Sequence, residues 1–307
     1  MPRIRDCSTE RKVDMETAIV RQRIHILDTL KGILILLVVI GHLLEVIPGF
    51  GLSHPLYKII YSFHMPAFIF ISGFFIKPSL KKLIRLLILF IATQLVYQIF
   101  VHLVYQKLPI TDFRITFQQP YWILWYLVVM IYYTCLSPIL NLTKGSGEWI
   151  TFGASVLFAL VVGYISEIGY PLSLSRFFVF LPFFIAGFYA KRHKEKIFTS
   201  FSKLTRKQKA FIFAGNALLL VPAVLFVVCG PVTAQMLYGS YSYKIGYNAA
   251  LRLLFMIIGG IWTFFLLAIV TFPGNRKIPV LSFVGKHTMP IYLIHGFLIK
   301  LIAWGII

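Results

Sequence analysis

The chain has 307 residues, of which 59% are hydrophobic and only 13% are charged, and its formal net charge is +20. Soluble domains average about 45–50% apolar and about 25% charged residues, so this composition excludes an ordinary soluble globular protein and indicates a membrane protein. The basic residues lie in short groups between apolar runs, which favours a membrane topology signal over a nucleic-acid-binding surface. The three cysteines are far apart and predict no disulfide framework.

The N-terminal segment differs from the rest of the chain. Residues 1–22 are polar and of mixed charge, and they lack the short basic region, apolar core and cleavage site of a signal peptide. We therefore expect a cytoplasmic tail over 1–22, followed by a single membrane-embedded domain over 23–307.

Apolar runs long enough to cross a bilayer recur throughout this domain. A spanning helix needs about 20 mostly apolar residues. The runs that meet this requirement are 29–47, 57–76, 83–105, 121–142, 149–166, 174–190, 210–229, 249–272 and 289–306. The run 174–190 is the weakest of them, because it is short and contains Pro182. The sequence predicts an all-α, polytopic membrane bundle of about nine to ten transmembrane helices.

The charges of the connecting segments predict the orientation of the bundle. Basic residues concentrate in the N-terminal tail and in alternate loops, with eight of them in the segment 191–209, whereas the intervening loops hold few. Cytoplasmic loops carry an excess of Lys and Arg. The alternation predicts nine crossings of the cell membrane, with the N-terminus in the cytoplasm.

Two histidines inside apolar runs are functional candidates, because ionisable side chains in lipid are costly and usually functional. At 1.5 Å per residue, His42 lies about 20 Å from the inner edge of the first run, and His64 about 10 Å below the outer edge of the second. These similar depths predict two rings that line one cavity open to the outside. The alternative is a pair of neutral histidines that bond to backbone carbonyls.

The acidic residues narrow the chemistry. Only ten are present, and Glu45 is the only one placed well inside an apolar run. A paired-carboxylate mechanism therefore has few groups to use, and a general base that titrates near neutral pH would be histidine. A proton-coupled transporter would more naturally show buried Asp or Glu. The pattern favours histidine-based group transfer and predicts no metal site.

Charged residues at the inner ends of the first and last runs allow two interpretations. Asp28 and Lys31 lie three residues apart on one helix face, either as part of a binding site or as a simple ion pair at the interface. Lys286 either contacts a phosphate or anchors the last run.

Polar and aromatic residues at the outer side are similarly ambiguous. Trp122 and Trp125 either stack on a sugar ring or anchor the helix at the membrane interface. Arg176 either meets an anionic ligand or is a solvated charge.

Four segments in order carry a resemblance to a known family: RIHILDTLKGILILLVVIGH, SFHMPAFIFISGFF, WILWYLVVM and YLIHGF. They resemble the motifs of the membrane acyltransferase-3 family, and most of all its fucose-4-O-acetylase-like and capsular polysaccharide O-acetyltransferase branch. The resemblance covers nearly the whole chain from Arg23 onward. It implies transfer of an acetyl group from cytoplasmic acetyl-CoA, as a co-substrate and not a bound cofactor, to a hydroxyl of a cell-envelope glycan or lipid-linked sugar.

The resemblance also implies roles for individual residues. The family's essential histidine falls on His42, and we expect His64 to assist it. The family's arginine falls on Lys31, which keeps the positive charge but lacks the planar guanidinium. The residues expected to bind the acyl donor are Lys31, Arg23, Asp28 and Lys286. The residues expected to bind the acceptor are Trp122, Trp125 and Arg176.

Two other classes of protein stay open at this point. A lipid-linked glycan transporter or flippase without acyl transfer would explain the spans, the basic face and the aromatic rim, and would not depend on CoA. A membrane assembly subunit with motifs that have lost their function would not need His42.

Overall fold

The computed structural model describes residues 27–105, 115–244, 246–271 and 278–306. The predicted tail over 1–22 lies outside these ranges. In the described residues, nine helices are long and apolar enough to cross a membrane, which confirms the prediction of a polytopic all-α bundle. The β-type pairing found in the described residues is an isolated antiparallel bridge between Lys244 and Tyr247.

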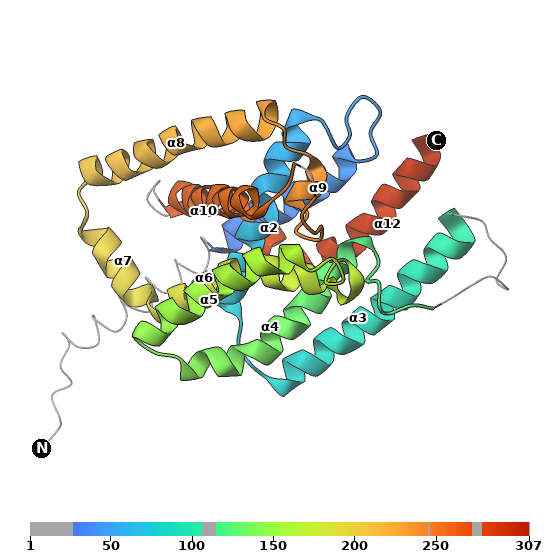
Figure 1. Cartoon of the computed structure of the whole chain (residues 1–307), viewed down its shortest axis with the longest axis horizontal. Helices are drawn as coiled ribbons and strands as arrows, with labels where there is room; N and C mark the ends of the chain where they lie inside the picture. The colour runs from blue at the N-terminus through green and yellow to red at the C-terminus, as the bar shows by residue number, and fades with distance from the viewer. Residues whose placement is uncertain (1–26, 106–114, 245, 272–277, 307) are drawn as a thin grey trace, which may run out of the picture.

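The membrane-spanning helices are joined by turns and by segments that contain shorter helices (Figure 1). They are the first helix Leu27–Leu44, α2 Pro55–Phe75, α3 Leu80–Phe100, α4 Trp125–Leu142, α5 Ser146–Val161, α6 Leu174–Arg192, α8 Arg206–Cys229, α10 Ala249–Thr271 and α12 Thr288–Ile306. The shorter elements are η1 Val101–Tyr105, η3 Trp122–Leu124, η4 Val162–Tyr164, η5 Pro171–Ser173, α7 Lys194–Lys203, α9 Ala234–Leu237 and α11 Pro279–Lys286.

Local sequence signals explain where several helices begin. Pro55 is the first residue of α2, where its missing N–H is no loss, and the His54 Nδ1 atom accepts a hydrogen bond from the Leu56 amide at 3.3 Å. Thr205 and Gln208 form a reciprocal capping box at the start of α8. The run 174–190, the weakest of the predicted spans, lies in the continuous helix α6. Pro182 is tolerated inside it because neighbouring helices can satisfy the backbone carbonyl that a proline leaves unpaired.

Helix α2 runs through the middle of the bundle and packs most extensively on α6 and α10 (Figure 1). The α2–α6 contact is backbone against backbone. A Cβ atom at Gly73 would overlap the Phe184 carbonyl, and one at Gly187 would overlap the Phe70 carbonyl. Small residues permit this close approach between helices in lipid, so these two glycines set the spacing of the two central helices.

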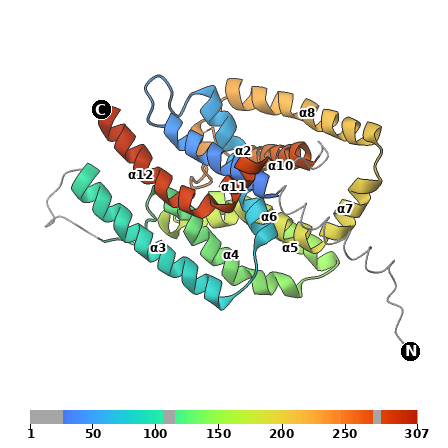
Figure 2. The ribbon, with the colours of Figure 1, turned by 180° about the vertical axis from the view of Figure 1, so that it is seen from behind.

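The bundle has two distinct ends. The end that holds the start of the first helix and α7 is called the Lys31 end. The opposite end, which holds the 45–54 turn and the C-terminal part of α12, is called the His42 end (Figure 1). At the Lys31 end, α11 crosses the first helix through Gly32 and Gly285 (Figure 2). This crossing brings the C-terminal end of α11 beside Asp28.

The end of the first helix differs from the sequence-based expectation. The helix ends at Leu44 and not at residue 47, because Pro48 and the positive-φ glycines Gly49 and Gly51 form the turn that follows. His42 therefore lies in the last turn of the helix. Glu45 lies just beyond the helix and not well inside the span, which corrects the predicted depth.

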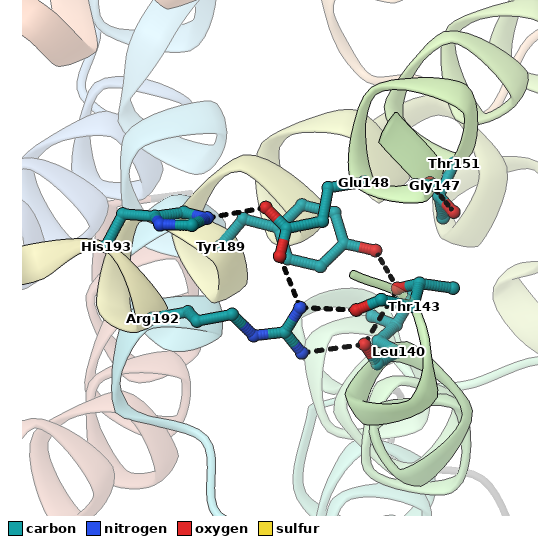
Figure 3. A network of polar contacts seen from close by, with 8 residues as sticks. All are labelled: Leu140, Thr143, Gly147, Glu148, Thr151, Tyr189, Arg192 and His193. Atoms are coloured by element: carbon teal, nitrogen blue, oxygen red, sulfur yellow. Dashed lines mark hydrogen bonds and ion pairs between the residues drawn. The ribbon is translucent and has the colours of Figure 1, made fainter. Parts of the chain in front are cut away.

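A network of charges joins three helices at the Lys31 end (Figure 3). The Glu148 carboxylate of α5 contacts Arg192 Nη1 at 2.5 Å and His193 Nε2 at 2.6 Å. The Arg192 guanidinium also donates to the carbonyls of Leu140, at 3.0 Å, and Thr143, at 2.5 Å. These carbonyls at the end of α4 lack the backbone N–H donors that a continuing helix would supply, so Arg192 caps α4 while it binds α5.

The glycine contact between α2 and α6 gives a stability test. Gly187→Ala should lower the free energy of unfolding by about 1–3 kcal/mol, because the new methyl group overlaps the backbone of α2. Thermal melting of the purified protein in detergent measures the change. The matched control is Gly215→Ala on α8, where a Cβ has no neighbour within 4 Å and alanine is the better helix former. Equal melting temperatures for the two variants would contradict the packing role.

Candidate functional site

His42 is held by polar contacts to its Nδ1 atom. Nδ1 lies 3.2 Å from Glu45 Oε1 and 3.0 Å from the Tyr61 hydroxyl. The Tyr61 hydroxyl in turn donates to Glu45 Oε1 at 2.5 Å. The three side chains come from the last turn of the first helix, the turn that follows it and the facing side of α2. When Nδ1–H donates to the carboxylate, the Nε2 lone pair of His42 is free to accept a proton.

Glu45 is the acceptor at the centre of this arrangement. The Tyr57 hydroxyl donates to the same Oε1 atom at 3.0 Å and also bonds to the Tyr238 hydroxyl at 2.7 Å. Burial raises the pKa of the Glu45 carboxyl, but the hydrogen bonds and charge of His42 and the tyrosine hydroxyls outweigh it and hold the pKa below its usual value. Glu45 is therefore a carboxylate at neutral pH.

Aromatic rings enclose part of the His42 imidazole. The Trp122 ring packs against it edge-on, with centroids 4.7 Å apart, and the His295 ring stacks on it at 5.5 Å. The His42 side chain remains 12% exposed, so the described residues do not enclose it completely. The site lies at the His42 end of the bundle, between the first helix, α2, η3 and α12.

Two further histidines have defined tautomers in their neutral forms. His64 Nδ1 lies 2.7 Å from the Ile60 carbonyl, and His295 Nδ1 lies 3.1 Å from the Ile291 carbonyl. A carbonyl only accepts, so in each neutral ring Nδ1 carries the proton and Nε2 is an acceptor. The His295 Nε2 atom is buried and has no hydrogen-bond partner.

His42 and His64, the predicted histidine pair, share Tyr61 as a neighbour and do not contact each other in the described ring contacts. The Tyr61 ring lies beside both rings, with its centroid 6.1 Å from that of His42 and 4.7 Å from that of His64. His64 is buried in α2 and hydrogen-bonded to its own helix, as the alternative interpretation of the sequence expected.

The residues predicted to bind an acceptor divide into two environments. Trp122 is half-buried and contacts His42. Trp125 is buried, stacks on Phe180 with centroids 5.5 Å apart, and has the Arg176 guanidinium 4.8 Å from its ring centroid. Of the two tryptophans, only Trp122 borders the histidine directly in the described contacts.

The residues predicted to bind an acyl donor lie at the opposite end. Lys31 Nζ forms an ion pair with the buried Asp28 carboxylate at 2.7 Å and lies 4.6 Å from the Phe75 ring centroid. Lys286 is exposed at the end of α11, which crosses the first helix next to Asp28. Arg23 lies outside the described residues.

Sequence reasoning missed three members of the site. Glu45 follows His42 by three residues and Tyr61 precedes His64 by three, so a search for polar neighbours one helical turn away would have found both. His295 lies in the YLIHGF motif, and this position is the one sequence signal that pointed to it.

The described side chains support acid–base chemistry at one imidazole. A base oriented by a carboxylate through its second ring nitrogen is the arrangement that activates hydroxyl groups in many transferases and hydrolases. Among the residues that the structure covers, no three His, Cys, Asp or Glu side chains group closely enough to hold a metal ion.

Comparisons with known proteins agree with this chemistry. A family profile described as an acyltransferase domain matches residues 24–303. The chain is 30% identical over 181 residues to the nodulation protein NolL of Sinorhizobium fredii, a match that covers 52% of this chain and 47% of that protein. It is 47% identical over 60 residues to NolL of Mesorhizobium japonicum, covering 18% and 16%. The chain thus spans less than half the length of these curated relatives.

No solved structure matches the chain. The profile match nevertheless extends over nearly all of the described helices, from the first helix to α12. The chain therefore belongs to the acyltransferase-3 family of membrane acyltransferases.

Proposed function

We propose that the protein is a membrane O-acetyltransferase. It moves an acetyl group from cytoplasmic acetyl-CoA to a hydroxyl of a cell-envelope glycan or lipid-linked sugar, as the resemblance to the fucose-4-O-acetylase-like branch implies. The observation that carries the proposal is the hydrogen-bonded His42–Glu45 pair at the His42 end of the bundle. An imidazole placed in this way is a general base for a sugar hydroxyl.

The transfer step uses His42 as the base. The hydroxyl proton moves to Nε2 of His42 while the hydroxyl oxygen attacks the thioester carbonyl. The new ester C–O bond forms and the C–S bond breaks. The proton then passes from His42 to the departing CoA thiolate, so that His42 returns to its starting form.

Glu45 positions the base and stabilises its charged form. Its carboxylate accepts from Nδ1, which fixes the tautomer with the lone pair on Nε2, and it offsets the positive charge that forms when His42 takes the proton. Tyr61 and Tyr57 hold the carboxylate from α2. The base is therefore oriented by a network whose members come from two different helices.

In their neutral forms, the other two histidines can accept a hydrogen bond at Nε2 but cannot donate one there to stabilise an oxyanion. A neutral His64 or His295 presents a lone pair at Nε2, because its Nδ1–H is already used by a backbone carbonyl. Such a ring can accept a hydrogen bond from a sugar hydroxyl but cannot donate one to the thioester oxygen. This favours a role for His64 in orienting the acyl acceptor.

The donor would approach from the Lys31 end, which we place in the cytoplasm on the basis of the loop charges. Lys31 and His42 lie on the same helix, about 16 Å apart at 1.5 Å per residue, so the donor would extend its thioester arm along the first helix. Asp28 orients Lys31, and Lys31, Arg23 and Lys286 would meet the donor's phosphates.

The acceptor would approach from the opposite side of the membrane. Trp122 contacts His42 and offers an aromatic surface for a sugar ring. Trp125, three residues later in the chain, contacts Arg176. A flippase would use the same rim without a donor, so dependence on acetyl-CoA separates the two functions.

Acetyl-CoA should raise the melting temperature of the detergent-purified wild-type protein, because a bound ligand stabilises the folded state. Lys31→Met should remove most of this shift, and Lys31→Arg should retain it, because arginine keeps the positive charge. Mass analysis of envelope glycans with and without an intact gene then tests the reaction, with one acetyl unit as the expected difference. A transporter would show neither the stabilisation nor the mass difference.

His42→Ala should lower kcat for acetyl transfer by about 10²–10⁴-fold, the usual contribution of a positioned general base. The assay measures acetyl transfer by the purified protein at a matched amount of folded enzyme. The control is His54→Asn, which removes another histidine at the same end while leaving a side chain that still caps α2. Equal rates for His42→Ala and the wild type would contradict the role of His42.

Glu45→Gln should lower kcat by about tenfold or more with little change in KM, because the amide cannot stabilise the protonated imidazole. Glu167→Gln is the matched control, because Glu167 is exposed in the 165–170 loop and hydrogen-bonds only to the neighbouring Ser166 among the described contacts. A loss of folded protein with an unchanged kcat per folded enzyme would instead assign Glu45 a structural role.

A further inference from the structure

Arg176 is a buried cation with an unused hydrogen-bond donor. It lies in the first turn of α6 and is only 9% exposed. Its Nε donates to the Tyr238 carbonyl at 3.1 Å, and its guanidinium lies 4.8 Å from the Trp125 ring centroid and 5.2 Å from that of Tyr170. Its Nη1 atom is buried and has no hydrogen-bond partner.

The charge of Arg176 also has no carboxylate partner in the described part of the chain. The ion pairs recorded there join Asp28, Glu45 and Glu148 to other cations. A buried charge without a counter-ion is strongly unfavourable, and so is a buried charged donor without an acceptor. An anion that enters the site would relieve both conditions.

Arg252 shows that burial alone does not explain this arrangement. It is also buried at the His42 end, at 1% exposure, yet each of its three nitrogens has an acceptor. Nε donates to the Tyr247 hydroxyl at 2.9 Å, Nη1 to the Ala159 carbonyl at 3.0 Å and Nη2 to the Tyr241 carbonyl at 2.6 Å. Arg252 therefore has a complete structural role, and Arg176 does not.

Arg176 and His42 flank the same part of the structure. Trp122 contacts His42, and Trp125, one turn further along, contacts Arg176. On the other side, Tyr238 accepts from Arg176 through its carbonyl, while its hydroxyl bonds to Tyr57, the partner of Glu45. The hydrogen bonds of Tyr238, Tyr57 and Glu45 thus connect the guanidinium to the proposed base, and neighbouring tryptophans of one segment contact the two groups.

A cavity adjoins this position. Its lining includes Val179 and Phe180, which follow Arg176 by about one turn of α6, together with Tyr61, Gly239 and Arg252, whereas Arg176 itself is not a lining residue. Tyr61 is the α2 residue that hydrogen-bonds to Glu45 and His42. The cavity therefore lies between Tyr61 of the proposed catalytic network and the turn of α6 that follows Arg176.

We propose that Arg176 binds an anionic group on the acyl acceptor and thereby selects acidic acceptors over neutral ones. The anion is a carboxylate of a sugar acid or a phosphate of a sugar phosphate or lipid-linked sugar, both of which accept hydrogen bonds from a guanidinium. Trp125 and Tyr170 form aromatic walls around the cation. This inference rests on the proposed acetyl transfer and adds the charge class of its acceptor.

The test compares acceptors that share one sugar and differ in charge: methyl glucoside, methyl glucuronoside and glucose 1-phosphate. The ratio of kcat/KM for a charged acceptor to that for methyl glucoside is measured for the full chain in detergent with acetyl-CoA. The ratio does not depend on the fraction of folded enzyme, so a partly unfolded variant cannot imitate the effect.

The wild type should prefer at least one charged acceptor by about 10–100-fold, as expected for a hydrogen bond to a charged group. Arg176→Gln should bring the ratio near one, and Arg176→Lys should retain part of the preference. Arg252→Gln, the matched control, should lose stability but keep the wild-type ratio. Whichever charged acceptor is preferred identifies the carboxylate or the phosphate as the source of the anion.

A binding measurement gives a second readout that does not require turnover. Glucuronate or inorganic phosphate should raise the melting temperature of the wild type above that in sodium chloride of the same ionic strength, and should not do so for Arg176→Gln. A wild type that uses neutral and charged acceptors equally, or an Arg176→Gln variant that keeps the preference, would overturn this inference and leave the acetyl transfer intact. Absence of acetyl transfer to every acceptor, with no stabilisation by acetyl-CoA, would overturn the proposed function and this inference with it.

Discussion

The close backbone contact between α2 and α6 is the constraint on which the central architecture depends. Gly73 and Gly187 let the two helices approach until each backbone meets the other. Helix α2 carries Tyr57, Tyr61 and His64, and α6 carries Arg176. The spacing of these two helices therefore also sets the distance between the proposed catalytic network and the buried guanidinium. In lipid, where apolar side chains gain little by leaving the solvent, this packing contact takes the place of hydrophobic burial.

The His42 site illustrates how a polar cluster is maintained at the edge of an apolar bundle. The Glu45 carboxylate lies just past the end of the first helix and accepts from His42, Tyr61 and Tyr57. Each donor satisfies part of a charge that would otherwise be costly to bury. The same contacts fix which nitrogen of His42 is available for chemistry, so stability and reactivity depend on one set of hydrogen bonds.

The number and order of the spans could be predicted from the sequence because bilayer thickness fixes the length of each apolar run, and the nine spans of the described residues agree with that prediction. The site could be predicted only in part. Depth along one helix was sufficient to make His42 a candidate, but it says nothing about which side chains from other helices contact it. His295 stacks on His42 because of how α12 crosses the first helix, and no single-helix pattern contains that information. Glu45 was misplaced because the helix end depends on the Pro48–Gly49 turn.

The charge network of Glu148, Arg192 and His193 limits how α4, α5 and α6 can tilt in the bilayer. A change in tilt, or a shift of one of these helices by a full turn, would move an ion pair into the hydrocarbon or leave a carbonyl of α4 unpaired. Both outcomes are unfavourable in lipid. Hydrophobic mismatch with a thicker or thinner membrane must therefore be absorbed by the lipid or by the peripheral helices. Helix α8, the least buried of the spans in the described residues, is free of this restraint.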